Sequence, residues 1–207
     1  MTALVLTIFG FFLGSLPFSV WLGRLVLKKD VRQYGDGNPG AANVGKAGGP
    51  VLGIIAVILD GLKGAIPVLI ARYTFHVGGP ALIPVALAPI AGHAFSPFLG
   101  FRGGKAIATT FGVWLGLTTW VGPTVLGGSV LGITAVLASS AWTIILAMFC
   151  WLGFMLWRSY GVIFLAIWAG NILILLWKHR DGLGEPVRLR PYLTGSDRGD
   201  ASDPSES

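Results

Sequence analysis

The stretch VLGIIAVILDGLKGAIPVLIARY (Val51–Tyr73) decides the fold class of this chain. A helix that crosses a membrane needs about 20 consecutive and mostly apolar residues. This stretch is long enough, and only Asp60, Lys63 and Arg72 interrupt it with charge. We therefore predict that it forms a membrane-spanning helix.

The whole chain has the composition of a membrane protein. It has 207 residues, of which 54% are hydrophobic and only 12% are charged, and its mean hydropathy is +0.74. Soluble domains carry about 25% charged residues. The first apolar segment continues past Val20 without a cleavage signal, so we interpret it as a retained helix rather than a signal peptide. The single Cys150 excludes an internal disulfide.

The apolar runs predict an all-α polytopic membrane protein with seven transmembrane helices, in one domain that covers residues 1–193. The breaks between the fourth and fifth spans and between the fifth and sixth are only a few residues long. The polar tail over residues 194–207 is predicted to be disordered. The predicted spans are Ala3–Leu27, Val51–Tyr73, Ala81–Leu99, Ala106–Trp120, Val121–Ala138, Trp142–Trp157 and Gly161–Trp177.

The basic residues predict the orientation of these spans. Cytoplasmic loops carry an excess of Lys and Arg, and a seven-span arrangement leaves only Arg72 and Arg158 on the other side. The N-terminus is therefore predicted outside and the C-terminus in the cytoplasm, whereas six spans would split this asymmetry. The basic side carries Lys28, Lys29, Arg32, Lys46, Arg102, Lys105, Lys178, Arg180, Arg188 and Arg190.

Two glycine-rich loops fall on this basic side. The first glycine-rich loop is YGDGNPGAANVGKAGG (Tyr34–Gly49), and the second lies in FRGGKAIATT (Phe101–Thr110), directly before a predicted helix. Successive glycine N–H groups form anion-binding nests, and a helix N-terminus adds unpaired donors, so both loops suit phosphate. Neither is a P-loop, because Ala106 stands where Ser or Thr would bind Mg²⁺. We expect neither a nucleotide nor a nucleic acid as ligand.

Simpler explanations exist for the same residues. Glycines in membrane proteins often allow close helix packing, and basic loop residues often only fix topology. His93 alone is more often a packed residue, and no His or Cys near it indicates a metal site. Asp60 and Lys63 are either a structural ion pair or part of the rim of the site. Several tryptophans are expected mostly at the membrane interface or facing lipid: Trp114, Trp120, Trp142, Trp151, Trp157 and Trp168.

Five blocks of the sequence together resemble the bacterial PlsY family of integral membrane acyl-phosphate:glycerol-3-phosphate acyltransferases. They are GSLPF (Gly14–Phe18), the first glycine-rich loop, DGLKGAIPVLIA (Asp60–Ala71), GHAFSPFLGFRGGKAIAT (Gly92–Thr109) and WKHRDGLGEPVRL (Trp177–Leu189). The resemblance implies transfer of an acyl group from acyl phosphate to the sn-1 hydroxyl of glycerol 3-phosphate, which gives lysophosphatidic acid. It also implies a site that faces the cytoplasm in the bacterial plasma membrane, no cofactor, no metal, and a functional link to an acyl-phosphate-forming enzyme.

The resemblance also implies the roles of individual residues. Asn38, Asn43, Lys105 and Glu185 are expected to act in catalysis, with the two Asn side chains as hydrogen-bonding groups that position substrate. Gly103 and Gly104 are expected to supply backbone donors to a phosphate, and Arg102 to supply charge. The full set expected to bind substrate phosphate is Gly35, Asp36, Gly37, Gly40, Lys46, His93, Arg102, Gly103, Gly104, Thr109 and His179.

This chain departs from the usual family pattern at defined positions. Asp36 replaces a Ser, Ala42 a Thr, Lys46 an Arg and Ala106 a Gly, and the last motif is shortened to KHRDGLGE. A carboxylate beside a phosphate site repels the ligand unless a cation neutralises it. We therefore expect Asp36 to pair with Lys46, Lys105 or Arg102. These departures also allow a divergent member with altered substrate or weak activity.

The mechanism is inferred from what the sequence lacks. Other glycerolipid acyltransferases use a His followed five positions later by an Asp, but Ala81, Phe98 and Gly184 stand at that spacing after the three His residues. Because an acyl phosphate is already activated, catalysis can rest on alignment and on stabilisation of charge, with a substrate phosphate as proton acceptor. The alternative is a non-enzymatic anion or phospholipid carrier on the same scaffold, although no inverted repeat is visible.

Overall fold

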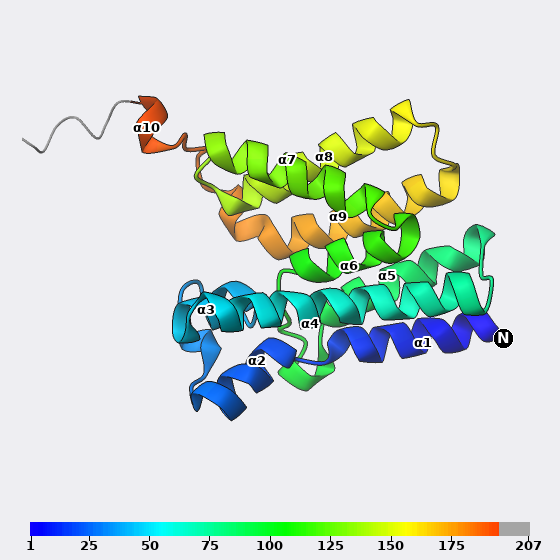
Figure 1. Ribbon diagram of the computed structural model, residues 1–207, viewed down its shortest axis with the longest axis horizontal. Helices are drawn as coiled ribbons and strands as arrows, with labels where there is room; N and C mark the ends of the chain where they lie inside the picture. The colour runs from blue at the N-terminus through cyan, green and yellow to red at the C-terminus, as the bar shows by residue number, and fades with distance from the viewer. Residues whose placement is uncertain (195–207) are drawn as a thin grey trace, which may run out of the picture.

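Long apolar runs fold into helices in a membrane because a helix satisfies all its backbone N–H and C=O groups within one segment. The computed structural model in Figure 1 describes residues 1–194, so the predicted disorder of residues 195–207 lies outside the described residues. The predicted all-α class is confirmed. The named helices are α1 (Thr2–Ser15), α2 (Phe18–Leu22), α3 (Ala41–Gly48), α4 (Pro50–Leu69), α5 (Leu82–Ala94), α6 (Ile107–Thr118), α7 (Val121–Val136), α8 (Ser140–Trp157), α9 (Val162–Leu183) and α10 (Pro191–Thr194).

Five helical segments within residues 1–194 are long and apolar enough to cross a membrane: Thr2–Leu27, Pro50–Thr74, Gly79–Leu99, Ser140–Trp157 and Val162–Leu183. The apolar helices α6 and α7 are shorter. All seven run along the same long axis in Figure 1, with the N-terminus at one end and α10 at the other. The chain is therefore an integral membrane bundle, in which α6 and α7 are the two predicted spans that do not reach the usual length.

The first predicted span, Ala3–Leu27, is not one continuous helix. It breaks between α1 and α2 at Leu16–Pro17 and ends in a π-helical turn, Gly23–Leu27. Pro17 has no backbone N–H, and its ring disfavours a helical conformation at the residue before it. The break leaves carbonyl groups without helical partners, and side chains from other segments donate hydrogen bonds to two of them. The Ser96 hydroxyl donates to Ser15 O at 2.6 Å, and Lys63 Nζ donates to Leu16 O at 2.7 Å.

The first glycine-rich loop is partly helical, whereas the sequence predicted only a loop. Its second half forms α3, which begins after Gly40 and ends at Gly48, before Gly49, where φ is +89°. Pro50 then begins α4, at a position where its missing N–H costs nothing. The short helix packs on α4 through two glycines, because a Cβ at Gly53 would lie 3.0 Å from the Cα of Gly45. The loop thus rests on the rigid helix α4.

Helix α4 lies at the centre of one layer, with α1, α5 and α6 packed around it (Figure 1). A Cβ at Gly112 of α6 would lie 1.9 Å from the carbonyl oxygen of Gly61, and one at Gly64 would lie 2.4 Å from that of Thr109. Helices α1 and α5 meet equally closely at Gly92. These contacts confirm the close-packing explanation for the glycines within the spans.

Helices α7, α8 and α9 lie beyond α6 and form the other layer (Figure 1). The expectation of tryptophans at the interface is wrong for Trp114 and Trp151, which are fully buried and pack edge to face at 5.2 Å. Trp114 Nε1 donates to Asn171 Oδ1, which gives its polar atom a partner inside the bundle. Trp120 and Trp157 lie at helix ends and are 73% and 75% exposed, as expected.

Candidate active site

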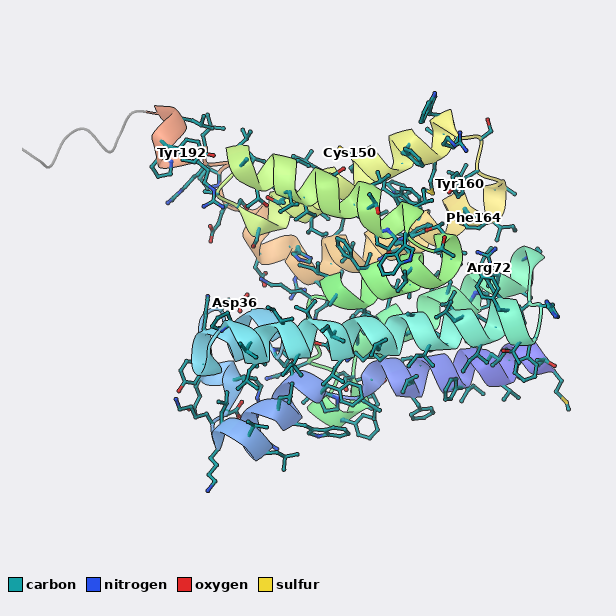
Figure 2. All side chains as sticks on the ribbon, viewed as in Figure 1. Asp36, Arg72, Cys150, Tyr160, Phe164 and Tyr192 are labelled. Carbon is teal, nitrogen blue, oxygen red and sulfur yellow. The ribbon has the colours of Figure 1, made fainter. Side chains whose placement is uncertain are left out.

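A cluster around Asp36 joins the two glycine-rich loops at one end of the bundle (Figure 2). Lys105 Nζ lies 2.7 Å from Asp36 Oδ2 and forms an ion pair with it. The Asn43 side chain donates to Asp36 Oδ1 at 2.9 Å, and the backbone N–H of Asn38 donates to the same oxygen at 3.2 Å. Three of the residues expected at the site therefore meet on the carboxylate of a fourth.

The charge of Asp36 is neutralised as predicted, and Lys105 is the cation that does it. Partial burial alone would raise the pKa of Asp36, but hydrogen bonds from Lys105, the Asn38 N–H and Asn43 lower it to about 2. The carboxylate is therefore ionised at neutral pH. Arg102 is exposed on the second loop and makes no ion pair within residues 1–194.

Glycines let the side chains of the first loop approach its backbone. Gly35 and Gly37 have φ of +59° and +72°, which L side chains rarely adopt. A Cβ at Gly35 would lie 2.3 Å from Asn43 Oδ1 and 2.6 Å from Lys46 Nζ, so Lys46 lies against Gly35 rather than on Asp36. Gly40 is constrained by neighbours, since its Cβ would lie 2.6 Å from Asn38 Nδ2.

The second loop is packed on the end of α5 through its two glycines, which we call the double-glycine turn (Gly103 and Gly104). A Cβ at Gly103 would lie 1.9 Å from the carbonyl oxygen of His93, and a Cβ at Gly104 would lie 2.3 Å from His93 Nε2. The Gly104 N–H donates to His93 O at 3.1 Å. That N–H is therefore not free to bind phosphate, contrary to the expectation. Helices leave the N–H groups of their first turn unpaired, so the start of α6 at Ile107 offers the remaining backbone donors.

A buried polar cluster lies next to His93, the residue on which this turn packs. Asp60 pairs with Lys63 at 2.8 Å and accepts a hydrogen bond from the Ser19 hydroxyl at 2.9 Å. His93 Nδ1 lies 3.8 Å from Asp60 Oδ1, and the imidazole is covered by Gly104. The Asp60–Lys63 pair is thus a structural ion pair that joins α4 to the broken first helix, and His93 lies between this pair and the turn.

The other expected site residues lie at different depths. Thr109 is buried and its hydroxyl donates to Asp60 O at 3.0 Å, so it ties α6 to α4. His179 is buried on α9, which extends past the predicted end at Trp177; its Nδ1 lies 2.9 Å from Leu175 O, and its Nε2 has no partner within residues 1–194. Glu185 follows α9 in an exposed segment and makes no described contact with the Asp36 cluster.

Lys178 is the residue that the sequence analysis missed as part of this site. It was counted only as a basic residue that fixes topology, yet its Nζ donates to Gly103 O at 2.8 Å and to Ala94 O at 3.1 Å. The only signal in the sequence was its place next to His179.

Cations at Lys46, Arg102, Lys105 and Lys178 outnumber the carboxylate of Asp36, so the arrangement can bind anionic groups. Within residues 1–194 no cluster of His, Cys, Asp and Glu could hold a metal.

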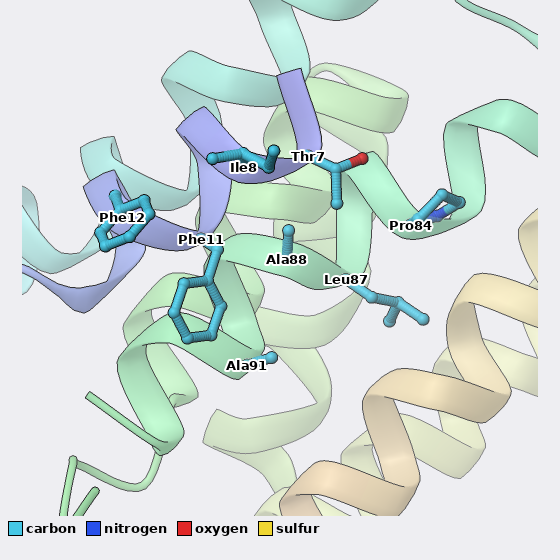
Figure 3. A pocket seen from close by; sticks show the side chains of 8 residues that line it. All are labelled: Thr7, Ile8, Phe11, Phe12, Pro84, Leu87, Ala88 and Ala91. Carbon is cyan, nitrogen blue, oxygen red and sulfur yellow. The ribbon is translucent and has the colours of Figure 1, made fainter. Parts of the chain in front are cut away.

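An apolar cavity of about 410 Å³ lies between α1 and α5 (Figure 3). Ile8 and Phe12, which line it, are exposed, so the cavity opens on the outer surface of the bundle. Its lining reaches Ala91, in the last turn of α5 and two residues before His93. A hydrocarbon chain could enter such a cavity from the lipid.

Comparisons with known proteins identify the family of this chain. The family model described as glycerol-3-phosphate acyltransferase matches residues 4–188. A glycerol-3-phosphate acyltransferase of Anaeromyxobacter sp. (strain Fw109-5) is 40% identical over 200 residues, which cover 90% of this chain and 96% of that protein. Glycerol-3-phosphate acyltransferase 1 of Thermotoga maritima is 38% identical, with 89% of this chain and 98% of that protein covered.

Solved structures give the same result. The crystal structure of PlsY, an integral membrane glycerol 3-phosphate acyltransferase, in its glycerol 3-phosphate form matches with a TM-score of 0.82 and 32% identity over 94% of each chain. Its lysophosphatidic acid form matches with a TM-score of 0.81 and 31% identity, over 94% of this chain and 93% of that one. The chain therefore belongs to the glycerol-3-phosphate acyltransferase family of integral membrane enzymes.

Proposed function

We propose that this protein transfers a fatty acyl group from acyl phosphate to the sn-1 hydroxyl of glycerol 3-phosphate. The hydroxyl oxygen attacks the acyl carbonyl carbon, the bond from that carbon to the phosphate oxygen breaks, and the hydroxyl proton ends on a phosphate. The products are lysophosphatidic acid and inorganic phosphate. The observation that carries this proposal is the Asp36–Lys105 pair, which joins both glycine-rich loops in a cluster with excess positive charge.

The charges of the site suit two phosphorylated substrates. Lys46 and Arg102 carry positive charge that no carboxylate within residues 1–194 pairs with. Lys105 is held by Asp36 and is placed where both loops meet. Such fixed cations stabilise charge on the tetrahedral oxyanion and on the departing phosphate. Asn38 and Asn43 shape the first loop and position substrate in this proposal.

No protein base is needed for this reaction. An acyl phosphate is a mixed anhydride, so alignment of the hydroxyl with the carbonyl carbon supplies much of the rate enhancement. His93 is buried under the double-glycine turn, and His179 is buried on α9. We therefore assign the hydroxyl proton to a substrate phosphate rather than to either imidazole. The cavity between α1 and α5 is the proposed entry for the acyl chain, because it opens on the surface and ends in the last turn of α5.

We further propose seven spans, with the N-terminus outside and the active site facing the cytoplasm. Asp36 and Arg72 lie at opposite ends of the bundle (Figure 2). Helices α3 and α10, which lie beside several of the basic residues in the sequence, are at the end of Asp36 (Figure 1). The positive-inside rule then favours that end as cytoplasmic, where an acyl-phosphate-forming enzyme would supply the donor. A reporter fused after Leu193 should be active only if it is one that folds in the cytoplasm. A periplasmic signal would overturn this orientation.

The deciding experiment is a transfer assay with purified protein. Acyl phosphate and labelled glycerol 3-phosphate are incubated with the protein, and lysophosphatidic acid is measured, with acyl-CoA and acyl carrier protein as competing donors. We expect product from acyl phosphate alone. Transfer from either thioester at a higher rate would overturn the donor assignment, and no transfer from any donor would support an anion or phospholipid carrier, which the family membership does not favour.

A further inference from the structure

The double-glycine turn is also held by a residue of α9. Lys178 Nζ donates to Gly103 O at 2.8 Å and to Ala94 O at 3.1 Å. These two carbonyls belong to the turn and to the last residue of α5. One ammonium group therefore links the turn, α5 and α9.

The peptide between Gly103 and Gly104 is fixed at both of its polar atoms. Its oxygen accepts from Lys178, and its N–H donates to His93 O at 3.1 Å. Neither glycine has room for a Cβ, so the peptide is also fixed sterically. A peptide unit is planar and rigid, so these two bonds set the direction in which the chain continues. The next residue is Lys105, which carries the ion pair to Asp36.

The surroundings of Lys178 distinguish it from the other cations of the site. It is half-buried, and within residues 1–194 it makes no ion pair with a carboxylate. Its polar partners within residues 1–194 are the two carbonyl oxygens. An ammonium removed from water needs such partners, so its position is tied to the geometry of the turn.

We propose that Lys178 is a positioning residue for the transfer reaction. It locks the Gly103–Gly104 peptide against His93 and so aims Lys105 and the start of α6 at the substrates. The inference rests on the proposed function, because it assigns Lys178 an effect on the same reaction through Lys105. The alternative role is a direct charge contact with a substrate phosphate.

The test compares Lys178→Met and Lys178→Arg with the wild type in the transfer assay, and uses Arg180→Met as the matched control. Arg180 lies two residues further along α9 and is exposed, and its guanidinium contacts only its neighbours on α9 within residues 1–194, by a hydrogen bond to Trp177 O and an ion pair with Asp181. We expect Lys178→Met to lower kcat about 100-fold, the scale of a misplacement of about 1 Å, with KM for glycerol 3-phosphate changed less than about threefold. Lys178→Arg keeps donors for both carbonyls and should recover most of kcat, and Arg180→Met should match the wild type.

A second measurement reports the turn independently of activity. Hydrogen exchange of the Gly104 amide should be faster in Lys178→Met than in the wild type, because the bond to His93 O loses its support, and unchanged in Arg180→Met. A raised KM with normal kcat and normal Gly104 protection would show a charge contact instead and overturn the proposal, as would wild-type kinetics in Lys178→Met. A wild-type protein without transfer activity would contradict the proposed function. The role of Lys178 in holding the turn would still be supported if the Gly104 amide exchanged more slowly in that wild type than in Lys178→Met.

Discussion

The first glycine-rich loop, residues 34–49, and the second, around Gly103 and Gly104, meet in one cluster, but side chains hold the first and backbone atoms hold the second. In the first loop, the Asn43 amide and Lys105 bond to the exposed carboxylate of Asp36. In the second, Gly103 and Gly104 pack on His93 with no space for a Cβ. Side-chain contacts at a surface accommodate substitution more readily than a close-packed backbone does. Three departures from the usual family pattern, at Asp36, Ala42 and Lys46, fall in the first loop, and a fourth, Ala106 with φ of +60°, follows the double-glycine turn in the second.

A large effect is expected from Gly103→Ala in the second loop. The new Cβ would lie 1.9 Å from the carbonyl oxygen of His93, so the turn must move, and a shift of about 1 Å near the chemistry costs about 100-fold in rate. Transfer kinetics and Tm are measured together. Gly100→Ala is the control, because Gly100 has φ of +58° but nothing within 4 Å of its Cβ. It should lower Tm through strain of about 1–2 kcal/mol and keep its activity. A Gly103→Ala protein with normal kcat would show that the turn is not part of the site.

An effect of at least the same size is expected from Lys105→Met at the contact between the loops. The substitution removes a fixed cation from the proposed transition state and leaves Asp36 unpaired. Loss of one such charge-stabilising donor costs about 100- to 1000-fold in kcat. The double variant Lys105→Met with Asp36→Ser should recover part of the loss, because it removes the unpaired carboxylate. Equal kinetics of the single and double variants would mean that the two side chains act independently. Lys28→Met, at an exposed basic residue outside the site, is the control.

The sequence predicted the all-α class and the resemblance of five blocks to one family, because apolar runs and motif order are local properties. It also predicted that Asp36 needs a cation, since that follows from charge alone. It did not reveal that Gly104 uses its N–H on His93, or that Lys178 reaches the turn from α9. Those contacts depend on which helices pack together. The break at Pro17 was readable from the residue itself, but the apolar run around it suggested a continuous span.

A modest effect is expected from Asp36→Ser and Asp36→Asn in the first loop. The pKa of Asp36 is lowered to about 2, so its ionised form, and the stability that its pairing provides, are present above the usual carboxyl pKa of about 4 and are lost only as pH falls toward 2. The pH profile of kcat near neutrality should therefore be the same in the wild type and both variants. Asp36→Ser should keep or improve the affinity for glycerol 3-phosphate. If both variants lose turnover by orders of magnitude at unchanged KM, Asp36 takes part in the chemistry itself.

The smallest effect is expected from Ala42→Thr, which restores the residue that the family usually has there. Ala42 is exposed near the start of the short helix α3, and Thr is a weaker helix former than Ala by less than about 1 kcal/mol. We expect kcat and KM within about twofold of the wild type and a Tm lower by about 2 °C. Kinetics for both substrates and a thermal unfolding curve measure these changes. If the first loop instead binds phosphate through the hydroxyl at this position, KM for glycerol 3-phosphate would fall by about tenfold, the worth of one hydrogen bond to a charged group. That result would mean that the first loop of this chain has lost a substrate contact, and it would contradict the view that its departures from the family pattern are tolerated.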